Sequence, residues 1–201
     1  MLRVGLTGGL ASGKSFVGHA LADLGCLLIQ ADELGHLVLL PGAEAYDGVV
    51  AEFGAGILNE DGSINRRKLA LIVFSDGSRL EALNRLVHPP VRERERRLAE
   101  EFAARNPSGI VVVEAAILVE TGGWKTYDRL IVVTCRPEQQ IQRAMHRDGI
   151  SREEAEARLR RQLPLEEKVK FAHYVIDTSG AKEDTLEQTR AVYRSLRSIA
   201  V

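Results

Sequence analysis

The stretch Gly8–Ser15, which reads GGLASGKS, constrains the fold of this chain more than any other feature. It has the pattern G-x-x-x-x-G-K-S, whose glycines let the backbone curl so that successive N–H groups form a nest for an anion. An apolar run at residues 2–7 predicts a buried strand directly before it. After it, Val17, Leu21 and Leu24 recur at helical spacing and predict one buried helix face. A strand, a glycine-rich loop and a helix in this order indicate a phosphate-binding loop.

This loop is expected to supply most of the contacts to ATP. The helix begins near Gly13, and its positive dipole end favours the phosphates. Lys14 is expected to reach the β- and γ-phosphates and to act in catalysis, and the Ser15 hydroxyl is an expected Mg²⁺ ligand. The alternative is a glycine-rich turn whose lysine is only solvated. The predicted nucleotide-binding residues here are Gly8, Gly9, Ala11, Ser12, Gly13, Lys14, Ser15 and Phe16.

Four further apolar runs predict the fold class. They lie at residues 26–30, 110–115, 129–134 and 173–177. Runs without alternation are typical of parallel strands that are buried on both faces, and helical patterns separate these runs. The expected fold is therefore α/β, a three-layer sandwich built on a five-stranded parallel sheet. Ligands of such sheets bind beyond the carboxyl ends of the strands.

Two segments are longer than this alternation requires. Residues 35–106 are mostly helical in pattern, with a strong turn signal at Asp61-Gly62, and part of them is expected to form a helical insertion over the sheet. Residues 142–170 are helical and rich in arginine, and are expected to form a lid that closes over ATP and excludes water. The expected core of the single kinase domain comprises residues 1–34, 107–141 and 171–201.

Acidic residues follow two of the predicted strands. Asp32 comes just after the run at 26–30 and could take the proton of an acceptor hydroxyl, or could be a helix N-cap. Glu114 closes the run at 110–115 and could hold Mg²⁺ through water, or could belong to a structural ion pair. Glu120 is expected to be a rim residue or a helix partner.

The arginine-rich segment contains two residues that suit a triphosphate. Arg143 and Arg147 share one face of a helix that is predicted to begin near Pro137. Ser151 and Glu154 predict a capping box at the start of a second helix, and Arg136 is expected to lie beside the adenine. Solvated pairs with glutamates 153, 154 and 156 are the alternative, and are favoured for Arg152, Arg158, Arg160 and Arg161.

Composition excludes several other classes of protein. The 27 basic and 28 acidic residues argue against a general nucleic-acid binder, and the arginine-rich segment has no aromatic residue on which a base could stack. No continuous apolar run is long enough for a membrane span. Cys26 and Cys135 lie in apolar runs, so burial is expected rather than a redox or metal role, and a reducing cytoplasm is the expected location.

Several motifs together resemble the dephospho-CoA kinases, which have an adenylate-kinase-like P-loop fold. The resemblance runs along most of the chain. The stretch FGAGILNEDGSINRRKLALIVFSD and the His88-Pro89 pair are its most specific parts. The other matching motifs are GLTGGLASGKS, ADELGH, LNRLVHPPVR, VEAAILVETG, QRAMHRDGISREEAEARLRRQ and AHYVID. Departures from the family pattern occur at Gln30, His36 and Phe16.

The resemblance implies that the γ-phosphate of ATP is transferred to the ribose 3′-hydroxyl of dephospho-CoA, and that the insertion 35–106 is the CoA-binding subdomain. It implies that Asp32 activates this hydroxyl, that Arg147 acts in catalysis, and that Arg66 and His88 contact the acceptor. A histidine that caps a helix before a proline turn is the alternative for His88. Another small-molecule kinase, acting on a nucleoside monophosphate or a sugar acid, and a nucleotide-dependent switch protein are the competing functions. The oligomeric state is left open.

Overall fold

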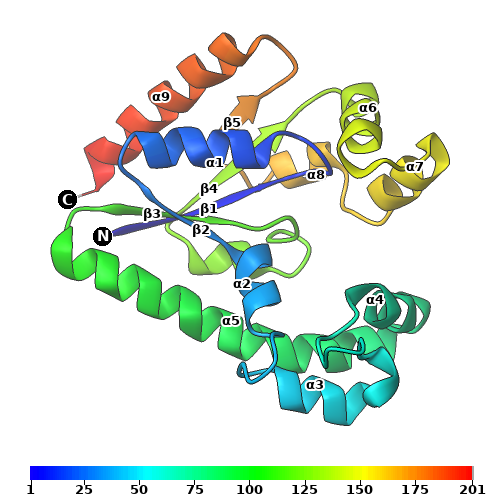
Figure 1. Cartoon of the computed structure of the whole chain (residues 1–201). Coiled ribbons are helices and arrows are strands. Elements are labelled where there is room, and N and C mark those ends of the chain that lie inside the picture. Colours follow the sequence, from blue (N-terminus) through cyan, green and yellow to red (C-terminus); the bar gives the residue numbers. More distant parts are fainter. Residues whose placement is uncertain (201) are drawn as a thin grey trace. The chain divides into compact units, whose positions relative to one another are not determined.

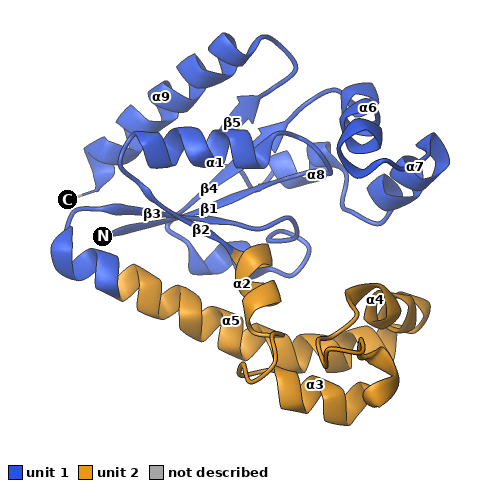
Figure 2. Ribbon diagram, in the orientation of Figure 1, with its two compact units in different colours: residues 1–30, 101–201 blue, residues 31–100 orange. Residues whose placement is uncertain are grey.

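The computed structural model describes residues 1–200. The chain divides into two compact units, which Figure 2 shows in different colours. The first unit joins Met1–Gln30 to the chain from Glu101 onward, and the second is Ala31–Glu100. Within the described residues, no helix is both long and apolar enough to cross a membrane.

The first unit contains a five-stranded sheet in which every pairing is parallel, which confirms the predicted fold class. The strand order is β2-β3-β1-β4-β5, so the carboxyl end of β1 opens between β3 and β4 (Figure 1). The strands are β1 (Leu2–Gly8), β2 (Leu27–Gln30), β3 (Ile110–Glu114), β4 (Arg129–Thr134) and β5 (Tyr174–Asp177). Every residue of β3 is buried, as the unbroken apolar run predicts for a strand that is covered on both faces.

Helices α1 and α9 lie side by side against this sheet (Figure 1). Val17 and Leu21 of α1 are fully buried, as predicted, whereas Leu24 is the C-cap residue and only half-buried. On α9 the buried side includes Thr185 and Thr189, which the apolar pattern does not indicate. The helices of this unit are α1 (Lys14–Asp23), α6 (Pro137–Asp148), α7 (Arg152–Arg160), α8 (Leu165–Val169) and α9 (Lys182–Ile199), with the short η2 (Gly123–Thr126).

The cysteines are buried, as predicted. Cys26 belongs to the apolar core between the sheet and these helices, and burial raises the pKa of its thiol to about 12. Burial also raises the pKa of the Cys135 thiol. A thiol that is hard to ionise is a poor nucleophile, so both residues act as small apolar side chains.

The second unit is helical and has its own apolar core. Its elements are α2 (Ala31–Leu37), α3 (Tyr46–Phe53), η1 (Ala55–Ile57), α4 (Arg66–Ser75) and most of α5 (Gly77–Arg105). Val38, Val49 and Ile57 are among the buried side chains of this core. The predicted turn at Asp61-Gly62 is confirmed, because the Asp61 carboxylate accepts the N–H of Ser63 at 2.9 Å and Gly62 has a φ of 79°.

The course of helix α5 shows that the alternative interpretation of His88, as a helix cap, is wrong. Its 29 residues continue through His88, Pro89 and Pro90, so His88 does not cap a helix before a proline turn. Proline has no N–H, and the carbonyls of Arg85 and Leu86 therefore lose their usual helical donors at this point. The helix persists because its apolar side, which includes Leu86, packs into the core of the second unit.

Candidate active site

The loop after β1 adopts a backbone that its glycines make possible. A Cβ atom on Gly8 would lie 2.5 Å from the carbonyl oxygen of Val133, which leaves room for no other residue type. Gly13 has a φ of 90°, in the left-handed region. Ala11 has a φ of 48° and is the one non-glycine residue with positive φ within residues 1–200. Such a conformation costs an alanine free energy, so the surrounding contacts must hold it in place.

Three side chains from distant segments donate to the outward carbonyls of this loop. Lys168 Nζ donates to the carbonyl of Gly8 at 3.3 Å, and Gln140 Nε2 donates to that of Leu10 at 2.8 Å. Thr178 Oγ1 donates to the carbonyl of Ser12 at 2.8 Å. In a trans peptide, a carbonyl and the N–H of the next residue point in opposite directions. The three donors therefore turn the N–H groups of Gly9, Ala11 and Gly13 toward the other side, where a phosphate would accept them.

The side chains of the loop add two further features. Lys14 Nζ donates to the carbonyl of Gly9 at 2.9 Å, so the ammonium lies against the loop. Ser12 is fully buried, and its hydroxyl oxygen has no hydrogen-bond partner among the described residues. A buried hydroxyl is normally paired, and an orphaned one beside a nest of N–H groups fits a phosphate oxygen.

The Ser15 hydroxyl and the Glu114 carboxylate, both predicted to serve Mg²⁺, lie together. Ser15 Oγ donates to Glu114 Oε1 at 2.8 Å, and Gln30 Nε2 donates to the other carboxylate oxygen at 3.2 Å. Glu114 is buried, and both of these partners are uncharged, so neither forms an ion pair with it. Magnesium prefers oxygen ligands and usually takes one or two from the protein, and the rest from phosphates and water. The donor set at this end of β3 fits that ion.

The predicted arginines have separate partners. Arg143 donates to the hydroxyl of Thr178 at 2.9 Å and to its carbonyl at 2.7 Å, and so supports the residue that holds Ser12. Arg147 is exposed and forms an ion pair with Asp148 at 2.7 Å, which raises the pKa of Arg147. Arg136 donates through its guanidinium to the carbonyl of Ser179 at 3.2 Å, in the segment after β5.

Arg152, Arg158 and Arg160 form surface ion pairs, and those of Arg152 and Arg160 involve the predicted Glu156. Arg152 pairs with Glu138 and Glu156, and Arg158 pairs with Asp148. Arg160 is 3.7 Å from Glu156. The predicted capping box of α7 is confirmed, because the backbone N–H of Ser151 donates to the Glu154 carboxylate and the backbone N–H of Glu154 donates to the Ser151 hydroxyl. The Glu154 carboxylate therefore accepts a hydrogen bond at the start of α7.

The three predicted acceptor-side residues, Asp32, Arg66 and His88, lie in the second unit. Asp32 is the second residue of α2, inside the helix, so the N-cap interpretation is wrong. The charges of Arg66 and Asp32 both act on His36: burial and then Arg66 lower the pKa of His36, whereas Asp32 raises it. Burial, and then Arg92, lower the pKa of the half-buried His88. A carboxylate and an arginine thus lie near the same histidine, close in sequence to the carboxyl end of β2.

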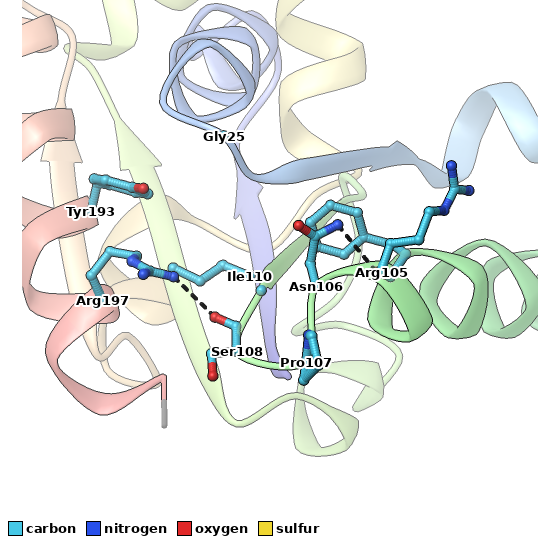
Figure 3. Close-up of a pocket in the computed structure, with 10 residues that line it drawn as sticks. Gly25, Arg105, Asn106, Pro107, Ser108, Ile110, Tyr193 and Arg197 are labelled. Carbon is cyan, nitrogen blue, oxygen red and sulfur yellow. Dashed lines mark hydrogen bonds between the residues drawn. The ribbon is translucent and has the colours of Figure 1, made fainter.

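A cavity of about 420 Å³ lies elsewhere in the first unit (Figure 3). Tyr193 and Arg197 of α9 line this cavity, and Arg197 donates to the carbonyl of Ser108 at 3.0 Å. Gly25 precedes β2 and Ile110 begins β3, so this cavity lies at the amino-terminal edge of the sheet. The phosphate loop lies at the opposite edge, where ligands of parallel sheets bind. The cavity therefore does not belong to the candidate active site.

Comparison with known proteins decides the family. The model of the family described as "CoaE: Dephospho-CoA kinase" matches residues 2–184. The chain belongs to the dephospho-CoA kinase family. It is 41% identical over 196 residues to the dephospho-CoA kinase of Aquifex aeolicus, with 98% of each chain covered. The family resemblance predicted from the motifs is confirmed, and with it an enzyme that uses ATP.

Solved structures support the same assignment. The structure of TT1252 from Thermus thermophilus is similar with a TM-score of 0.84 and 33% identity, over 96% of each chain. The dephospho-CoA kinase of Campylobacter jejuni is similar with a TM-score of 0.72 and 26% identity, over 99% of this chain and 98% of that one. None of these matches favours the switch protein or a different small-molecule kinase over membership of the dephospho-CoA kinase family.

Proposed function

We propose that this chain transfers the γ-phosphate of ATP, bound with Mg²⁺, to the ribose 3′-hydroxyl of dephospho-CoA. The observation that carries the proposal is the phosphate loop of a dephospho-CoA kinase family member. Its carbonyls are held from outside, and its buried Ser12 hydroxyl has no partner among the described residues. This arrangement suits the phosphates of the donor.

The donor side of the reaction lies in the first unit. The loop N–H groups and Lys14 would hold the β- and γ-phosphates, and Ser15 and Glu114 would hold Mg²⁺, the latter through water. The ion supplies positive charge that offsets the charge developing on the phosphate oxygens. Arg143 and Arg147, one turn apart on α6, add guanidinium groups for the transferring phosphoryl group. To contact that group, Arg147 would have to release Asp148, with which it forms an ion pair in this structure.

The acceptor side uses residues of the second unit. Asp32 would take the proton of the ribose 3′-hydroxyl as its oxygen attacks the γ-phosphorus, and ADP would leave with the electron pair of the broken P–O bond. Arg66 suits the phosphates of the acceptor, because a guanidinium can donate two hydrogen bonds to one phosphate. The half-buried His88 would contact the acceptor from α5, and the depressed pKa of its imidazole keeps it neutral at neutral pH.

Replacement of Asp32 tests the proposal. Asp32→Asn removes the general base and should lower kcat with dephospho-CoA by about 10²-fold, with the Kd for ATP within about twofold of the unchanged protein. Glu33→Gln is the matched control, because Glu33 is the adjacent acid in the same first turn of α2. It should leave kcat within about threefold. Turnover and ATP binding are measured separately, by ADP release and by calorimetry.

Two results would contradict the proposal. A loss below about threefold in Asp32→Asn would show that Asp32 is not the base. Faster turnover of a nucleoside monophosphate or of gluconate than of dephospho-CoA would show that the acceptor is a different one. The unchanged protein should therefore be assayed against all three acceptors before any variant is made.

A further inference from the structure

Lys168 is the buried cation that no part of the proposed reaction uses. Of the described residues it is the one lysine or arginine among the buried polar side chains, and it is fully buried. It lies on the five-residue helix α8, directly after the segment that contains α6 and α7. A buried ammonium costs free energy unless each of its protons finds an acceptor. The contacts of Lys168 therefore show what this position is built to hold.

All three donor positions of the Lys168 ammonium are used. Nζ donates to the carbonyl of Gly8 at 3.3 Å, to the carbonyl of Ala116 at 2.9 Å and to Glu120 Oε1 at 2.7 Å. Gly8 is the first residue of the phosphate loop. Ala116 lies two residues after Glu114, the expected Mg²⁺ carboxylate. One ammonium thus joins the backbone on the two sides of the nucleotide site.

Glu120 links this ammonium to the turn between α7 and α8. Its Oε1 also accepts the N–H of Leu163 at 3.2 Å, in the turn between α7 and α8. Next to that turn, Leu165 lies where a Cβ atom on Gly9 would meet it at 3.3 Å. The carboxylate offsets the lysine charge, so the pair contributes hydrogen-bond geometry rather than a net positive field. The segment from Leu163 to Lys168 is thereby attached to the phosphate loop.

We propose that Lys168 is a positioning residue for ATP: held by Glu120, it fixes the carbonyls of Gly8 and Ala116 and so keeps the N–H groups of the loop directed at the phosphates. The peptide that joins Gly8 to Gly9 is planar, so holding the Gly8 carbonyl sets the direction of the Gly9 N–H. A loop whose donors are already aimed loses less entropy when the nucleotide binds. The inference rests on the proposed function only where turnover is measured, because ATP binding can be measured without an acceptor.

Lys168→Met tests the role, because methionine keeps much of the volume and removes all three donors. The Kd for ATP, measured without any acceptor, should rise at least about tenfold, and the KM for ATP should rise with it. The KM for dephospho-CoA should stay within about twofold. Lys170→Met is the matched control, since Lys170 is an exposed lysine two residues away that pairs with Glu167. It should change neither constant by more than about twofold.

Glu120→Gln keeps the proposal testable if Lys168→Met does not fold. It preserves an oxygen acceptor for Leu163 and removes the charge that fixes the ammonium, so the Kd for ATP should rise in the same direction by at least about threefold. A lower unfolding temperature with an unchanged Kd for ATP, in a variant that is folded at the assay temperature, would overturn the proposal. Absence of turnover in the unchanged protein would refute the proposed function instead, and the ATP titration would still decide the role of Lys168.

Discussion

Replacing Thr178 with valine should weaken ATP binding although Thr178 is not expected to touch ATP. The residue follows β5, is buried, and lies between Arg143 and the phosphate loop. Its hydroxyl donates to the carbonyl of Ser12 at 2.8 Å and accepts from Arg143 at 2.9 Å. Valine has nearly the same shape and neither donates nor accepts. The substitution therefore removes one of the three side-chain donors to the loop carbonyls.

The contacts of Thr178 set the size of the effect. A hydrogen bond between neutral groups contributes about 1 kcal/mol net, and a buried acceptor that is left unpaired costs about 1–3 kcal/mol. Arg143 keeps its second bond, to the Thr178 carbonyl at 2.7 Å, so the arginine is not released. The free energy of unfolding should fall by about 1–2 kcal/mol. If about 1 kcal/mol of this is lost from the loop geometry that ATP requires, the Kd for ATP rises about fivefold.

Thr189→Val separates the effect on the loop from the loss of a buried hydroxyl. Thr189 is fully buried on α9 and its hydroxyl donates to the carbonyl of Thr185 at 2.7 Å, within the same helix. It should lower stability by up to about 1 kcal/mol and leave the Kd for ATP unchanged. Urea unfolding gives the stabilities and calorimetry gives the two values of Kd. Equal Kd values for the two variants would refute the reasoning, because the loop carbonyl would then need no side-chain donor.

Two further predictions concern the metal and the pH dependence of stability. Glu114→Gln removes the carboxylate beside Ser15, so the Mg²⁺ concentration that gives half-maximal turnover should rise at least about tenfold; an unchanged Mg²⁺ titration would remove Glu114 from the metal site. The pKa of His88 is lowered from 6.5 in the folded state, so the unfolded chain binds the proton more readily. The stability that neutral His88 contributes is fully present above about pH 6.5 and is lost as the pH falls through and below that value. His88→Gln should therefore make the urea midpoint fall less between about pH 7.5 and about pH 5.5, and an equal fall in both proteins would contradict this.

The sequence predicts the sheet well because each strand is a local pattern. All five strands lie within about one residue of the predicted runs, since buried parallel strands need unbroken apolar residues. The loop and the Ser15–Glu114 pair follow from the same logic, because the carboxyl ends of adjacent strands β1 and β3 meet at one edge. Motif and topology together were sufficient to predict where this loop and this pair of residues lie in the sheet.

Helix ends and helix interiors were harder to predict. The His88-Pro89-Pro90 sequence reads as a boundary, because proline removes a helical donor, yet α5 continues through it. Apolar packing in the second unit outweighs the two lost hydrogen bonds. Asp32 likewise reads as an N-cap by residue type, but the helix begins one residue earlier. At the two prolines of α5, tertiary packing overrides a local preference.

The residues that hold the phosphate loop from outside could not be found from local patterns. Gln140, Lys168 and Thr178 are separated from the loop by 130, 160 and 166 positions, and no motif marks them. Their function follows from one geometric requirement. A nest that presents N–H groups to an anion must turn its carbonyls outward, and carbonyls buried there need donors from some other part of the chain. The donors come from α6, α8 and the residue after β5, so a displacement of Gln140 or Lys168 would change the direction of the loop N–H groups that these side chains orient.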